Sequence, residues 1–112
     1  MDKIKDDLDE ECITALIEVK IVPQQGDGYD RIAQRIYQYK EVDSLYLMTG
    51  SYDLLVTMTA NTMKEAAAFV YEHLAAIKGV SSTATRFIMK KYKEQGRVYI
   101  EETEQEERVV FR

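Results

Sequence analysis

Every odd-numbered residue from Ile13 to Ile21 is apolar, whereas the even-numbered residues up to Val22 are mixed in character. Successive side chains of a β-strand point to opposite faces, so this period of two predicts a strand with one face against a hydrophobic layer. Pro23 cannot donate a hydrogen bond to a neighbouring strand, and it ends the run. The chain is thereby committed to a sheet that has one wholly apolar face.

Three further strands are predicted downstream of this one. Two alternating runs, roughly residues 42–49 and 52–60, are separated only by Gly50-Ser51. A two-residue connection with glycine first is typical of a type II′ hairpin, because glycine takes the positive φ of the first turn position without strain. The last strand of the core is expected from residue 80 to about residue 92, where Thr83 and Thr85 share one face.

Two amphipathic segments lie between these strands. The first has apolar residues at helical spacing from Tyr29 to Tyr37, and Asp27 is expected to cap it. The second begins at Asn61 or Thr62, with Thr62 and Glu65 spaced as a capping box, and is expected to run to residue 78 and close at a C′ glycine. The only histidine falls in or beside its apolar stripe, where a core or boundary role is expected rather than a ligand or catalyst.

The order of these elements is β-α-β-β-α-β, the split βαβ arrangement of ferredoxin-like α+β folds. Right-handed crossovers then place both helices on one face of a four-stranded antiparallel sheet. The other face is uncovered but semi-apolar, because Leu16, Val22 and Leu55 fall on it. Such a face is rarely left to water, so we expect a homodimer whose two sheets pack face to face or join at their edges.

Composition excludes several classes of function. The 112 residues fit one domain, and a net charge of −5 with a pI of about 4.9 disfavours direct nucleic-acid binding. One cysteine, Cys12, and one distant histidine leave little for a disulfide framework or a zinc site, so no metal or cofactor is expected. No signal peptide and no apolar run near 18 residues are present, which predicts a cytoplasmic protein without membrane contact.

The ends of the chain differ from its middle. We expect an acidic N-terminal tail over residues 1–12, a folded domain over residues 13–93, and an acidic C-terminal appendage over residues 94–112. The appendage closes on an apolar tip, Val109, Val110 and Phe111. It is interpreted either as a solvated tail or as a segment whose tip docks on a partner subunit.

The predicted hairpin turn is unusually rich in polar side chains. Thr49, Ser51, Tyr52 and Asp53 bring three hydroxyls and a carboxylate beside turn N–H groups that have no ladder partner. A small zwitterion could use all of these groups: the N–H groups hold a carboxylate, and Asp53 pairs with an ammonium. The alternative is that Ser51 and Asp53 are ordinary turn formers that satisfy their own backbone.

Three segments resemble the effector-binding domain of the Lrp/AsnC transcriptional regulators, the domain named for regulation of amino acid metabolism (RAM): E-V-D-S-L-Y-L-M-T-G-S-Y-D-L-L-V-T-M-T-A, A-A-I-K-G-V and S-S-T-A-T-R-F-I-M-K-K-Y-K. The resemblance covers about residues 13–93. It implies a dimeric α+β barrel, often assembled further, that binds amino acids or related metabolites between subunits near the turn. Carried over by position, it implies these ligand-binding residues: Gly50, Ser51, Tyr52, Asp53, Thr83 and Thr85.

The chain also departs from that family's pattern. Full regulators carry a helix-turn-helix ahead of this domain, and the short acidic leader here is too short to form one. The resemblance therefore implies a stand-alone sensor without its own DNA-binding domain, which could modulate full-length Lrp/AsnC regulators by mixed assembly or regulate an enzyme. A piece cut from a longer protein is the alternative.

Two other classes of function remain open at this stage. One is a small enzyme on a dimeric α+β barrel, because a fold does not dictate a function. No carboxylate pair or Cys/His set recurs at site-like spacing, and the only histidine lies on a helix, so we expect no catalytic residues. The other is a structural assembly module, which an oligomer indifferent to ligands would favour.

Overall fold

The computed structural model describes residues 12–22 and 28–99. Most of the predicted acidic tail, the expected cap Asp27 and the apolar tip at Val109, Val110 and Phe111 lie outside the described residues.

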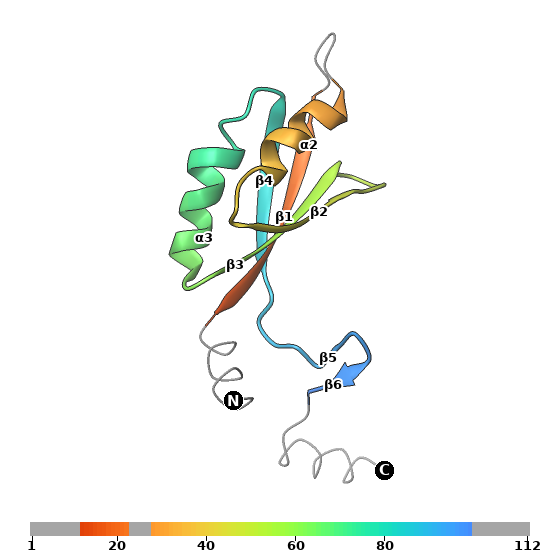
Figure 1. Cartoon of the computed structure of the whole chain (residues 1–112), viewed down its shortest axis with the longest axis vertical. Coiled ribbons are helices and arrows are strands. Elements are labelled where there is room, and N and C mark those ends of the chain that lie inside the picture. Colours follow the sequence, from red (N-terminus) through yellow and green to blue (C-terminus); the bar gives the residue numbers. More distant parts are fainter. Residues whose placement is uncertain (1–11, 23–27, 100–112) are drawn as a thin grey trace.

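Four antiparallel strands form one sheet in the order β2-β3-β1-β4, and both main helices cover the same face of it (Figure 1). A separate two-stranded hairpin follows β4. The predicted βαββαβ order is confirmed. The elements are β1 (Ile13–Ile21), α2 (Tyr29–Tyr37), β2 (Val42–Leu47), β3 (Leu54–Ala60), α3 (Met63–Phe69), the π-helical turn η1 (Val70–Leu74), β4 (Val80–Phe87), β5 (Lys93–Glu94) and β6 (Arg97–Val98).

The hydrophobic core lies between the sheet and the helices. The apolar set predicted for β1 faces it, and Ile17 is fully buried opposite Val56 of β3. Ile36 of α2 and Leu74 of η1 close the layer from the helical side and are equally inaccessible. Each such side chain contributes roughly 1.5–3 kcal/mol through the apolar surface that it removes from water. The core therefore depends on the single apolar face that the alternation of β1 predicted.

Both residues of the predicted capping box at the start of α3 make capping hydrogen bonds, although the Glu65 side chain reaches the N–H before the Thr62 cap and not that of Thr62 itself. The Thr62 side chain accepts a hydrogen bond from the Glu65 N–H at 3.0 Å, and the Glu65 carboxylate accepts one from the Asn61 N–H at 3.0 Å. Two N–H groups at the helix start are satisfied in this way. The helix start is therefore determined by residues close together in the sequence.

Replacing Thr62 with alanine is expected to lower the free energy of unfolding by about 1 kcal/mol, because the N–H of Glu65 loses its acceptor. Urea denaturation followed by circular dichroism measures the change. Lys64→Ala, at an exposed position one residue before Glu65, is the matched control and should stay within about 0.5 kcal/mol of the parent. Equal urea midpoints for Thr62→Ala and Lys64→Ala would contradict a stabilising role for the Thr62 cap.

The end of the second helix was predicted incompletely. After Phe69 the chain widens into the π-helical turn η1, in which the Ala75 N–H donates to the Val70 carbonyl at 2.8 Å. The regular helix therefore stops before residue 78, although Gly79 does take the positive φ, +101°, expected of a closing glycine. Periodicity did not anticipate the π-helical turn.

The last core strand, β4, is shorter than predicted because β1, the strand with which it pairs, extends no further. The Ile88 N–H donates to the Thr14 carbonyl at 3.0 Å, and β1 begins only one residue before Thr14. Beyond Ile88 the chain has no further ladder partner in β1, and it leaves the sheet. It then forms the β5–β6 hairpin around Gln95 and Gly96, whose φ values of 51° and 82° are typical of a type I′ turn.

Within residues 12–22 and 28–99, no helix combines the length and the apolar character needed to cross a lipid bilayer.

Candidate functional site

The connection between β2 and β3 is longer than the predicted two-residue turn. The Met48 N–H donates to the Asp53 carbonyl at 2.8 Å, so four residues, 49–52, loop out beyond that pair. The predicted type II′ turn is therefore wrong, because the last hydrogen-bonded pair lies one residue farther from the turn on each strand than a two-residue turn requires. Gly50 nevertheless has φ +118°, a conformation that side-chain-bearing residues rarely adopt.

Asp53 ties this turn to the end of β1. Its Oδ2 accepts a hydrogen bond from the Ile21 N–H at 2.8 Å, and its own N–H donates to the Val19 carbonyl at 3.0 Å. Since β3 begins only after Asp53, the carboxylate supplies the acceptor that a continuing strand would have supplied. Asp53 thus satisfies the backbone of a neighbouring strand, which neither interpretation of the sequence anticipated.

The other turn residues surround this carboxylate. Tyr52 and Asp53 are half-buried, whereas Gly50 and Ser51 are exposed. The remaining oxygen of Asp53, Oδ1, accepts no hydrogen bond from the described residues. A Cβ added to Gly50 would meet nothing within 4 Å, so the turn backbone is open to approach from outside. The turn therefore combines one uncommitted carboxylate oxygen with accessible backbone.

Thr83 and Thr85 lie elsewhere on the sheet. They pair with Val19 and Ile17 and are half-buried on the helix-facing side of the edge strand β4. Because β1 separates β4 from β3, two strand spacings, about 10 Å, separate Thr83 from the start of β3. One chain thus holds four of the six predicted residues together and leaves the two threonines apart from them.

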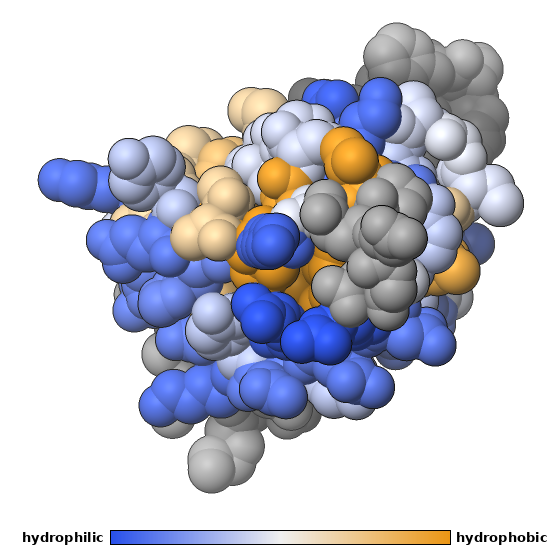
Figure 2. Space-filling model, turned by 90° about the horizontal axis from the view of Figure 1, so that it is seen from above, coloured by the Kyte–Doolittle hydropathy of each residue, from blue (hydrophilic) through white to orange (hydrophobic). Residues whose placement is uncertain are grey.

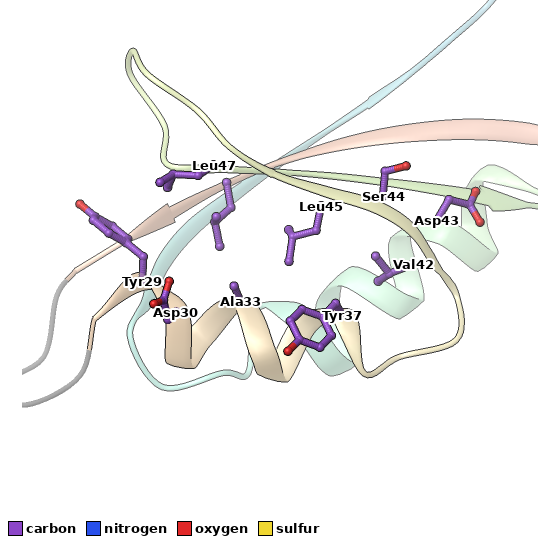
Figure 3. A pocket seen from close by; sticks show the side chains of 10 residues that line it. Tyr29, Asp30, Ala33, Tyr37, Val42, Asp43, Ser44, Leu45 and Leu47 are labelled. Carbon is purple, nitrogen blue, oxygen red and sulfur yellow. The ribbon is translucent and has the colours of Figure 1, made fainter.

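A groove of about 460 Å³ opens between α2 and β2 (Figure 3). Leu45 and Val42 point from β2 toward α2, whereas Ser44 points away from the helix. None of the six predicted site residues lines it. Its lining consists of Tyr29, Asp30, Ala33, Tyr37, Val42, Asp43, Ser44, Leu45, Leu47 and Leu54.

Sequence reasoning missed the groove. The helical spacing from Tyr29 to Tyr37 predicted only the apolar face of an amphipathic helix, and it gives no indication of a groove between that helix and a strand. The available signal was the pair of tyrosines at the two ends of the helix, facing an edge strand rich in leucine.

His73 packs in an aromatic cluster and not in a polar site. Its ring centroid lies 5.0 Å from that of Tyr39 and 5.2 Å from that of Phe69, and the residue is half-buried. The predicted boundary role is confirmed. Across the described residues, no group of three or more His, Cys, Asp or Glu side chains is placed to hold a metal ion.

Comparison with known sequences gives a consistent result. The family model described as the Lrp/AsnC ligand binding domain matches residues 14–98. The chain is 48% identical over 89 residues to the uncharacterized HTH-type transcriptional regulator YugG of Bacillus subtilis, a match that covers 80% of this chain and 54% of that protein. The chain spans about half the length of the curated relatives it matches. Those relatives are transcriptional regulators rather than enzymes, in agreement with the sequence prediction.

Solved structures agree with the fold. The Neisseria meningitidis transcriptional regulator NMB0573, solved as an L-Met complex, superposes with a TM-score of 0.68 at 25% identity, covering 78% of this chain and 56% of that one. TTHA0845 from Thermus thermophilus superposes with a TM-score of 0.64 at 23% identity, covering 73% of this chain and 99% of that one. Since the family model spans residues 14–98, most of the chain, the protein belongs to the Lrp/AsnC ligand binding domain family.

Proposed function

We propose that the chain is a sensor for an amino acid or a closely related metabolite, which binds at the turn formed by residues 49–53. The observation that carries the proposal is the arrangement around Asp53, in which one carboxylate oxygen is held by Ile21 and the other accepts nothing from the described residues. A carboxylate fixed in this way is positioned for an ammonium group, and it needs no reorganisation when the ligand arrives.

The rest of the turn suits the other end of a zwitterion. Exposed backbone N–H groups near Gly50 and Ser51 can donate to a ligand carboxylate, and the missing Cβ of Gly50 allows close approach. The hydroxyls of Ser51 and Tyr52 can complete the shell. The N. meningitidis relative was solved with L-methionine, which supports an amino acid as the class of ligand.

The proposed site is shared between subunits. In one chain the turn is open, and Thr83 and Thr85 lie on the free edge strand β4, where another subunit can meet them. Leu16 and Leu55 lie half-buried on the face of the sheet that no helix covers, beside the ion pair between Arg86 and Glu18 at 2.9 Å. We therefore place the chain in a homodimer, or a higher oligomer, that covers this face and completes the site with the two threonines.

The response reaches transcription through other proteins. A chain with net charge −5 is repelled by phosphate, so the partner of choice is a full-length regulator of the same family, bound by mixed assembly in the cytoplasm. The family supports a ligand-dependent regulator over a catalyst or a passive assembly module.

The test measures binding of the common L-amino acids to the whole chain, beginning with L-methionine. Calorimetric titration gives the Kd, and thermal denaturation with and without the amino acid gives the melting temperature. A binding amino acid at about 100 times its Kd should stabilise the fold by about 2.7 kcal/mol, visible as a higher melting temperature. N-acetyl-L-methionine, which lacks the ammonium, and L-methionine methyl ester, which lacks the carboxylate, are the controls and should bind far more weakly. Failure of every amino acid at millimolar concentration to shift the melting temperature would contradict the proposal.

A further inference from the structure

The groove between α2 and β2 takes its shape from one face of the helix. Tyr29, Ala33 and Tyr37 follow one another at intervals of four residues, so they lie in a row along α2. The two tyrosines are 39% and 59% exposed, and the small Ala33 between them is half-buried. The hollow of the groove therefore lies over Ala33, between two aromatic rings.

The side of the groove that the sheet forms is apolar. Val42 and Leu45 point from β2 toward α2, and the buried Leu54 of β3 also lines the groove (Figure 3). Leu47, 67% exposed, adds apolar surface near the start of α2. Figure 2 views the molecule from the end at which α2 begins, and it shows apolar surface open to solvent among hydrophilic side chains. Both walls of the groove thus offer hydrocarbon contact to a molecule that enters from solvent.

The charged groups among the described residues that line the groove are two carboxylates. Asp30 stands near Tyr29 in the first turn of α2, and Asp43 lies toward the other end (Figure 3). The Thr59 hydroxyl donates to Asp43 Oδ2 at 2.9 Å, so that carboxylate is already engaged within the sheet. Asp30 makes no ion pair or hydrogen bond with the described residues. Asp30 is therefore the uncommitted charge of the groove.

This lining discriminates between an amine and an amino acid. Lys, Arg and His are absent from the described lining, so a ligand carboxylate would meet two like charges and no cationic side chain. An ammonium group on a hydrocarbon body suits the same lining, because it pairs with Asp30 and can also lie against the face of the Tyr29 ring. The hydrocarbon then extends over Ala33 toward Tyr37.

We propose that the α2–β2 groove binds an amphipathic amine, an ammonium on an aromatic or aliphatic body without a carboxylate, with the ammonium at Asp30 and the body over Ala33. The groove volume of about 460 Å³ falls within the range of roughly 300–1,000 Å³ that is typical of small-molecule sites. None of the residues of the proposed amino-acid site lines the groove. The amine is thus a second class of ligand, bound independently of the turn.

The test is a proton–nitrogen NMR titration of the whole chain with phenethylamine. Chemical shifts should change at the backbone amides of Ala33, Leu45 and Leu47, which lie along the groove, and saturate at millimolar amine, as expected of a small ligand.

Two molecules with the same ring and chain are the ligand controls. In 2-phenylethanol a hydroxyl replaces the ammonium, so this molecule should bind about fivefold more weakly than phenethylamine. L-Phenylalanine adds a carboxylate to phenethylamine and should leave the amides of Ala33, Leu45 and Leu47 unshifted.

Two variants test the charge and the hollow separately. Asp30→Asn keeps the size of the side chain and should weaken phenethylamine binding about fivefold, because the ammonium loses its carboxylate partner. Glu72→Gln, at an exposed position of η1, is its control. Ala33→Leu fills the hollow with a good helix former and should abolish saturable binding. Ala67→Leu, at an exposed position of α3, controls for the added bulk.

Several results would overturn the inference. They are shifts confined to residues 49–53, an equal response to phenethylamine and 2-phenylethanol, and an unchanged affinity in either Asp30→Asn or Ala33→Leu. Unshifted groove amides at millimolar amine, as a second copy covering the groove would produce, count against it equally. Asp53→Asn alters the proposed amino-acid site and should leave phenethylamine binding unchanged, so failure here and failure of the proposed sensor function are distinguishable.

Discussion

Asp53→Asn is expected to weaken amino-acid binding by about 10- to 100-fold while leaving the fold nearly as stable as before. A hydrogen bond to a charged group contributes about 1.5–3 kcal/mol, and the asparagine amide cannot pair with a ligand ammonium as a carboxylate does. Its oxygen can still accept the hydrogen bond from the Ile21 N–H, so the tie between the turn and β1 remains. Isothermal titration with the best-binding amino acid measures the loss of affinity, and thermal denaturation measures the stability of the fold.

Two further variants separate the two roles of Asp53. Asp53→Ala also leaves the part-buried Ile21 N–H without its acceptor, so it should lower the free energy of unfolding by about 1–3 kcal/mol besides losing the ligand. Glu72→Gln removes one negative charge at an exposed position of η1 and should change neither property. An unchanged affinity of Asp53→Asn for the amino acid would show that Asp53 only holds the turn to β1 and does not pair with the ligand.

Ile17→Ala is expected to lower the free energy of unfolding by about 2–5 kcal/mol, a large share of the 5–15 kcal/mol typical of a small domain. Ile17 is fully buried at the centre of β1, between Val56 of β3 and Thr85 of β4, and strands on both sides prevent the backbone from collapsing into the space left behind. Guanidinium denaturation at a fixed protein concentration measures the change.

The matched control for Ile17→Ala is Ile17→Val, which removes one methylene and should cost about 0.5–1.5 kcal/mol. Leu16→Ala tests the opposite face of the same strand. Its side chain is only half-buried in one chain, so a loss as large as that of Ile17→Ala would indicate cover by a second subunit. A small effect of Ile17→Ala would contradict the assigned core.

Features that depend on neighbours in the sequence were predicted well. The alternation of β1 identified its buried set, and the spacing of Thr62 and Glu65 identified a helix start that the hydrogen bonds confirm. Whether the six proposed ligand-binding residues meet a ligand stays a prediction.

Errors arose where the result depends on strand register. The four-residue connection between β2 and β3 follows from the pairing of Met48 with Asp53, and β4 stops near Ile88 because β1 begins at Ile13. Neither the residue type nor the spacing at these positions carries that information. The α2–β2 groove was also not predicted, because its shape depends on the distance between the helix and the edge strand.

By itself the sequence determined the order of the elements, the apolar face of the sheet and the presence of a polar turn, since periodicity, capping and glycine conformation act over a few residues. Only the tertiary structure decided what Asp53 does, because its partner Ile21 lies 32 residues away and meets it through the pairing of β1 with β3. The strand order likewise separates Thr83 and Thr85 from the turn, and it makes β2 an edge strand of the four-stranded sheet. A one-residue slip in any pairing would change these contacts without altering the pattern from which the fold was predicted.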